Sequence, residues 1–120
     1  MSVDYRGHLS TGYLSKVTNR IDGKRYNIST VRNARTKEWE TFVYKQGLFG
    51  AFRPLLCVGA QDGKQAGWVH DRVEEIAEQH NPADWRDAKS ALIYSDEYAV
   101  ASEAGFFQKM LQAAGQDRDQ

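Results

Sequence analysis

The spacing of apolar residues changes part-way along the chain, and this change constrains the fold more than any other feature. Residues 24–31 alternate, with Tyr26, Ile28 and Thr30 on one face of the segment, as in a strand that is buried on one side. In residues 69–77 the apolar positions instead recur every three or four residues, which is typical of an amphipathic helix. A chain with strands first and helices second predicts an α+β fold.

Four segments carry the strand signal. Asp22-Gly23, a dipeptide that favours tight hairpin turns, separates the first two segments. In residues 39–45 Trp39, Thr41 and Val43 fall on one face of the strand, opposite two aromatic residues. The predicted strands are 13–19, 24–31, 39–45 and 55–59. We therefore predict an antiparallel meander of three to four strands, packed with two to three C-terminal helices.

The C-terminal half contains three helix signals and one ambiguous stretch. Asn81-Pro82 ends the first helix and begins a second, whose buried stripe would be Trp85, Ala88 and Leu92. Residues 91–101 fit either two short strands around a turn at 95–97 or the start of a last helix. The final helix would carry Phe106, Phe107, Met110, Leu111 and Ala114 and end at Gly115. Residues 1–115 would then form a single domain, followed by a flexible tail at 116–120.

Length and composition exclude several classes of protein. The 120 residues are enough for one domain, and 41% of them are hydrophobic, as in an ordinary globular protein. The chain has one cysteine, so it can form no internal disulfide and no cysteine-based zinc site. No apolar run approaches the ~18 residues of a membrane-spanning helix, and residues 1–10 lack the apolar core of a signal peptide. We expect a cytoplasmic protein that has no membrane partner and no cofactor.

Charge is unevenly distributed although the formal net charge is zero. Residues 1–54 hold ten basic and four acidic side chains, a balance of +6. Residues 55–120 hold six basic and twelve acidic side chains, a balance of −6. If the two halves occupy different faces, the folded protein carries a dipole that can engage a charged partner. The alternative is that the two sets neutralise each other within the fold.

Catalytic and metal-binding signals are weak. Cys57 lies in an apolar run, where a thiol is usually inert, and no nucleophile–base–orienter set is recognisable. His70, Glu74 and Glu78 share one helix face, a spacing that can hold a divalent cation but is also common on solvated faces. The glycines of loop 58–65 are too closely spaced for a phosphate-binding loop. These patterns favour a non-catalytic protein and leave enzymatic activity open.

A protein-binding surface is the first functional hypothesis. In residues 47–53 large apolar side chains stand among glycines, and exposed aromatic and arginine residues there would anchor a partner. Folded inward, the same side chains would close one end of the core. The predicted contacts are Arg32, Arg35, Lys37, Phe49, Phe52 and Arg53. The acidic alternative is Asp71, Glu74, Glu75 and Glu78. Homo-oligomerisation also stays open.

Nucleic-acid binding is the second hypothesis. Basic residues neutralise phosphates, and the interleaved aromatics Tyr13, Tyr26 and Trp39 could stack on unpaired bases. These aromatics could equally form the core face of the sheet. The basic residues concerned are Arg20, Lys24, Arg25, Arg32 and Arg35.

Residues 26–80 also carry a family resemblance. The runs 26–31 (YNISTV) and 39–44 (WETFVY), followed by an amphipathic helix with Trp68 and His70, resemble small accessory proteins of phages and mobile elements. The resemblance implies no known active site. It implies an accessory factor that binds host or phage machinery, such as a regulator or an inhibitor of a bacterial defence system.

Overall fold

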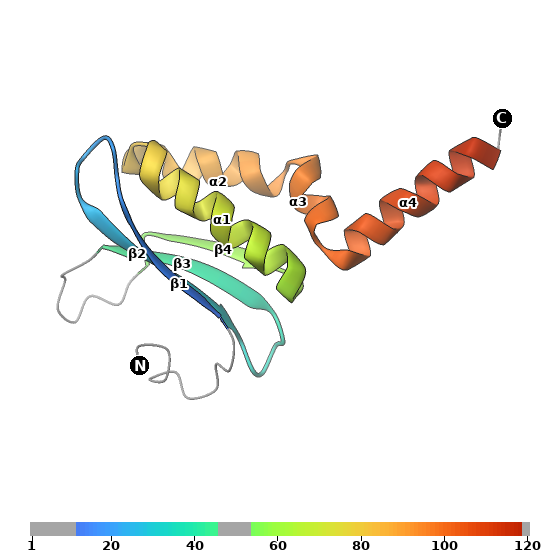
Figure 1. Cartoon of the computed structure of the whole chain (residues 1–120), viewed down its shortest axis with the longest axis horizontal. Coiled ribbons are helices and arrows are strands. Elements are labelled where there is room, and N and C mark those ends of the chain that lie inside the picture. The colour runs from blue at the N-terminus through green and yellow to red at the C-terminus, as the bar shows by residue number, and fades with distance from the viewer. Residues whose placement is uncertain (1–11, 46–53, 119–120) are drawn as a thin grey trace.

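Four strands form one antiparallel sheet in the order β1-β2-β3-β4 (Figure 1). A computed structural model of the chain describes residues 12–45 and 54–118. The strands are β1 (Tyr13–Thr18), β2 (Arg25–Arg32), β3 (Trp39–Lys45) and β4 (Leu56–Ala60). Each strand pairs with the next along the chain, and each begins and ends within one residue of the predicted segment. The predicted meander is therefore confirmed.

The helices follow the sheet, and the first two lie over one of its faces (Figure 1). They are α1 (Gly63–Gln79), the 3-10 turn η2 (Pro82–Asp84), α2 (Trp85–Ile93), α3 (Asp96–Ala101) and α4 (Glu103–Arg118). Helix α1 packs against all four strands, and α2 and α3 pack beside it. This arrangement confirms the α+β class.

The core lies between α1 and the covered face of the sheet. Ile28, Val43 and Val58 are fully buried on β2, β3 and β4, and they meet Val69 and Val73 of α1. These are the inward positions of the period-2 and period-3.6 patterns, so the alternation itself selects the buried face. Each such side chain contributes about 1.5–3 kcal/mol by leaving water.

Side-chain caps fix where three helices begin. Asp62 accepts a hydrogen bond from the Gln65 amide at the start of α1, at 2.8 Å. Asn81 accepts from the Ala83 amide in the first turn of η2, at 3.0 Å. Ser95 accepts from the Tyr98 amide and so begins α3. The ambiguous residues 91–101 therefore form the end of α2, a break at Tyr94 and Ser95, and the short helix α3, which begins where a serine cap is followed by two acidic residues.

Helix α4 differs in two ways from the final helix that the sequence predicts. Gly115 does not end α4, which continues to Arg118. Glycine ends a helix by taking a left-handed conformation, and Gly115 has no positive φ. In addition, α4 leaves the body of the protein and contacts chiefly α3 (Figure 1). Its apolar residues are therefore not part of the core.

Candidate functional site

A tightly hydrogen-bonded turn joins β2 to β3 and carries two of the predicted contact residues, Arg35 and Lys37, while a third, Arg32, ends β2. The side-chain oxygen of Asn33 accepts from the amides of Arg35 at 2.9 Å and Thr36 at 3.1 Å. The Asn33 carbonyl accepts from the Lys37 amide, and the Asn33 amide donates to the Glu38 carbonyl, each at 2.8 Å. An asparagine that bonds to its own turn fixes the backbone, so Arg35 and Lys37 project from an ordered support.

Lys37 is the one non-glycine residue with a positive φ in the described parts of the chain. Its φ is 68°, in the left-handed region where a Cβ costs roughly 1–2 kcal/mol. Lys37 is exposed, so no packing requires a lysine at this position. Strained backbone often marks a functional position, and here it presents a positive charge at the tip of the sheet.

Replacing Lys37 separates backbone strain from charge. Lys37→Gly removes both, whereas Lys37→Ala removes the charge and keeps the Cβ. We expect the glycine variant to be about 1 kcal/mol more stable than the alanine variant in urea denaturation. Equal stabilities would contradict the assignment of strain to Lys37.

The β1–β2 turn lies at the opposite end of β2 and presents the other basic group. Asp22 accepts from the Lys24 amide at 2.8 Å and from the Tyr26 hydroxyl at 2.5 Å. The hydrogen bond from Tyr26 lowers the pKa of Asp22, and desolvation raises the pKa of Tyr26 to about 12. The turn is thus built by local polar contacts. Its basic side chains are all exposed, namely Arg20, Lys24 and Arg25.

The structure therefore divides the predicted basic residues into two groups. Arg32 and Arg35 lie near the β2–β3 turn, whereas Arg20, Lys24 and Arg25 lie at or beside the β1–β2 turn. The length of β2, about 23 Å at ~3.3 Å per residue, separates the groups. The remaining predicted contacts, Phe49, Phe52 and Arg53, lie outside the described residues.

The charges of the two halves do not neutralise each other within the parts of the chain that the structure describes. One ion pair occurs there, between Arg72 and Glu75 of α1. The other acid–base contact, from His70 to Glu74, also lies within α1 and would be an ion pair only with a protonated histidine. No basic side chain of residues 12–45 takes part, so the positive charge of the sheet remains on its surface. Of the acidic alternative on α1, Asp71 and Glu75 are exposed, while Glu74 and Glu78 are half-buried.

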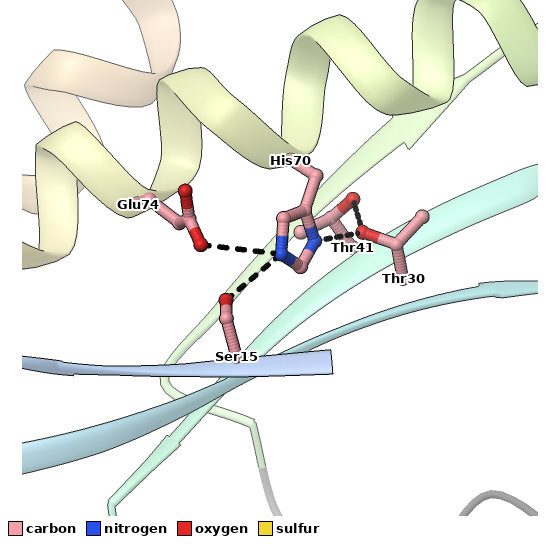
Figure 2. A network of polar contacts seen from close by, with 5 residues as sticks. All are labelled: Ser15, Thr30, Thr41, His70 and Glu74. Atoms are coloured by element: carbon pink, nitrogen blue, oxygen red, sulfur yellow. Dashed lines mark hydrogen bonds and ion pairs between the residues drawn. The ribbon is translucent and has the colours of Figure 1, made fainter. Parts of the chain in front are cut away.

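A polar network joins α1 to the sheet around His70 (Figure 2). The Nδ1 atom of His70 lies 2.7 Å from the Thr30 hydroxyl, which lies 2.6 Å from the Thr41 hydroxyl. The Nε2 atom lies 2.9 Å from the Ser15 hydroxyl and 3.5 Å from a carboxylate oxygen of Glu74. The imidazole is 5% exposed, so both its nitrogens are satisfied inside the protein.

This network does not have the geometry of a serine hydrolase. In such enzymes the serine and the carboxylate address opposite nitrogens of the histidine. Here Ser15 and Glu74 both face Nε2, and Thr30 occupies the other nitrogen. Burial lowers the pKa of His70, and the nearby carboxylate of Glu74 opposes that shift only in part. The ring is thus a neutral connector between helix and sheet.

The structure also shows the surroundings of the candidate nucleophile, the candidate metal ligands and the loop 58–65. Burial and the charge of Glu40 raise the pKa of the Cys57 thiol, which makes it a poor nucleophile. No group of three metal-ligating side chains occurs in residues 12–45 and 54–118, and Glu78 does not join His70 and Glu74. The loop 58–65 contributes a helix cap, because Asp62 caps α1.

A pocket of about 360 Å³ lies between α1 and α2. At this pocket Arg72 stacks over Trp68 and pairs with Glu75.

Sequence patterns alone do not identify the polar network around His70, although they place some of its residues on buried faces. Thr30 and Thr41 occupy inward positions of two predicted strands, and His70 lies next to the apolar face of the first helix. Polar side chains on buried faces are expected to form hydrogen bonds with one another. The register that brings them together comes only from the structure.

The comparisons with known proteins give no relative. No family model, curated protein or solved structure matches this chain. No helix among the described residues has the length and apolar character needed to cross a membrane.

Proposed function

We propose that this chain is a non-catalytic interaction protein that binds a protein partner with an acidic surface through the β2–β3 end of its sheet. The observation that carries the proposal is the ordered β2–β3 turn, which holds Arg35 and Lys37 exposed and places Lys37 in a strained conformation. A rigid turn loses little conformational entropy on binding, which favours recognition.

A protein partner fits these residues better than a nucleic acid. Nucleic-acid binding would need the basic groups on one surface, together with aromatic rings that can stack on bases. The two basic groups lie at opposite ends of β2. Of the three aromatic residues, Tyr26 is 3% exposed and packs against Trp85 at 4.9 Å between centroids, so it cannot stack on a base. Only Tyr13, which is 45% exposed, and the half-buried Trp39 present part of a ring to solvent.

Charge reversal at the two ends of the sheet tests the proposal. The Arg32→Glu/Arg35→Glu variant changes the β2–β3 end, and Arg20→Glu/Lys24→Glu makes the same charge change at the other end. In affinity capture from host extract, with mass spectrometry, we expect the first variant to lose about tenfold or more of a specific protein partner. The second variant should retain it. Equal losses would show that only net charge matters and would contradict the proposal.

A salt titration tests the nucleic-acid alternative directly. Binding of single-stranded DNA or RNA oligonucleotides would weaken steeply with salt, because bound phosphates release counterions. We expect no binding at low salt. Tight binding that is lost in the Arg20→Glu/Lys24→Glu variant would favour the alternative and place it at the β1–β2 turn.

The narrowest form of the proposal, a phage-type regulator or inhibitor of a bacterial defence system, rests on the resemblance of residues 26–80. Identification of the captured protein tests it: a component of such a system supports this form, and an unrelated protein removes it while leaving the interaction function in place.

A further inference from the structure

Helix α4 carries an exposed apolar stripe. Phe106, Phe107, Met110 and Leu111 recur at helical spacing, and between 47% and 62% of each side chain is exposed. A helix of this length is marginal in water without packing on one face. The Lys64 ammonium of α1 lies 4.7 Å from the centre of the Phe106 ring, but about half or more of each of the four side chains remains exposed to solvent.

The corner between α3 and α4 prevents the stripe from turning onto the body of its own chain. Ser102 is 2% exposed, and its hydroxyl bonds the Ala99 carbonyl and the Gly105 amide. A Cβ at Gly105 would lie 1.8 Å from the Ala99 carbonyl oxygen, so the two helices touch there. Asp62 accepts from the Glu103 amide at 2.9 Å and ties the start of α4 to α1. The direction of α4 is thus fixed, and it points away from the core (Figure 1).

We propose that the stripe of α4 binds the same stripe on a second copy of the chain, with the two helices antiparallel. A stripe of this kind is self-complementary about a two-fold axis. No charged residue interrupts it between Phe106 and Leu111 except Lys109, which the helical period places on the opposite side. The formal net charge of zero means that two copies do not repel, and antiparallel helices oppose their dipoles favourably.

The exposed area predicts a weak dimer. A free side chain of this size presents about 150–250 Å², so the four exposed fractions correspond to about 400 Å² per copy. Two copies would bury on the order of 800 Å², which is less than stable interfaces bury and corresponds to a weak, transient contact. We therefore expect dissociation in the micromolar range or above, which makes the dimer dependent on concentration.

Sedimentation equilibrium of the full chain tests this proposal. From about 1 to about 500 μM, we expect the average mass to rise from 13.6 kDa toward about 27 kDa. The Phe107→Gln/Leu111→Gln variant, which keeps good helix formers, should remain at the monomer mass. A wild-type mass of 13.6 kDa at every concentration would overturn the proposal.

A matched control separates the stripe from general surface hydrophobicity. Leu14→Gln/Ile21→Gln removes two apolar side chains that are 53% and 58% exposed, on β1 and in the β1–β2 turn. This variant should dimerise like the wild type, and its failure to do so would show that α4 is not the specific interface. The dimer does not depend on the proposed function, because the α4 variant leaves the β2–β3 turn used for partner capture unchanged.

Discussion

Replacing Asn19 with alanine is expected to destabilise the protein by about 3–4 kcal/mol. Asn19 is fully buried, and its amide group donates to the carbonyls of Ala77 and His80, each at 2.7 Å. Its side-chain oxygen accepts from the amides of Ile21 at 2.8 Å and Asp22 at 2.9 Å. Alanine removes all four bonds, and it leaves the buried Ala77 carbonyl without this donor at a cost of about 1–3 kcal/mol, while the three part-buried bonds contribute about 0.5–1.5 kcal/mol each. Urea denaturation monitored by circular dichroism measures the loss.

Asn27 provides the matched control for this substitution. It is a half-buried asparagine on β2 whose side-chain oxygen is buried without a hydrogen-bond partner. Asn27→Ala should therefore cost less than about 1 kcal/mol, because an unpaired acceptor contributes no bond to lose. If both variants lost the same stability, the cost would lie in asparagine packing in general and not in the link between the first turn and α1.

Replacing His70 is expected to have the second-largest effect. His70→Ala leaves a cavity between α1 and the sheet and deprives the Thr30 and Ser15 hydroxyls of a partner. We expect a loss of about 2–4 kcal/mol at pH 7.5, from the combined cavity and hydrogen-bond terms. The same urea experiment measures it. A loss of under 1 kcal/mol would contradict a stabilising role for His70, in packing and in hydrogen bonding alike.

The pH dependence of the free energy of unfolding tests the protonation of His70 separately from its packing, because packing alone does not change with pH. Burial lowers the pKa of His70 in the folded protein below its ordinary value of 6.5. The unfolded chain then binds the proton more tightly, so stability falls as pH drops through about 6.5 and levels off below the folded pKa. Because Glu74 and Asp71 oppose the shift, the slope should be shallower than for an isolated buried histidine. His70→Gln, which stays neutral, should lose this part of the pH dependence.

Local patterns determine most of the fold. The strands of the meander are predictable because alternation, the Asp22-Gly23 turn and short connections all agree. Residues 91–101 stay ambiguous in the sequence because their helix depends on one cap, Ser95, and on packing against α1 and α2. The exposure of α4 is not predictable, since Phe106 and Leu111 have the spacing of a core-facing stripe. Periodicity shows which residues share a face, but not whether anything covers it.

The candidate site is only partly predictable for the same reason. The sequence identifies Arg32, Arg35 and Lys37 as basic and accessible, and they lie at one exposed end of the sheet. It does not reveal that β2 separates them from Arg20 and Lys24, because that distance depends on strand pairing. Nor does it reveal the strain at Lys37, which follows from the hydrogen bonds of Asn33.

One carboxylate at the end of β4 serves two helices. The two oxygens of Asp62 accept separately from the Gln65 and Glu103 amides, which lie far apart along the chain. Asp62 is one of several links at this place, because the Gln65 side chain also donates to the Tyr98 carbonyl and the Tyr98 hydroxyl donates to the Gly59 carbonyl. The placement of α3 and α4 therefore depends on the same few residues that end β4 and begin α1. A substitution of Asp62 would remove the cap of α1 and one anchor of α4 together.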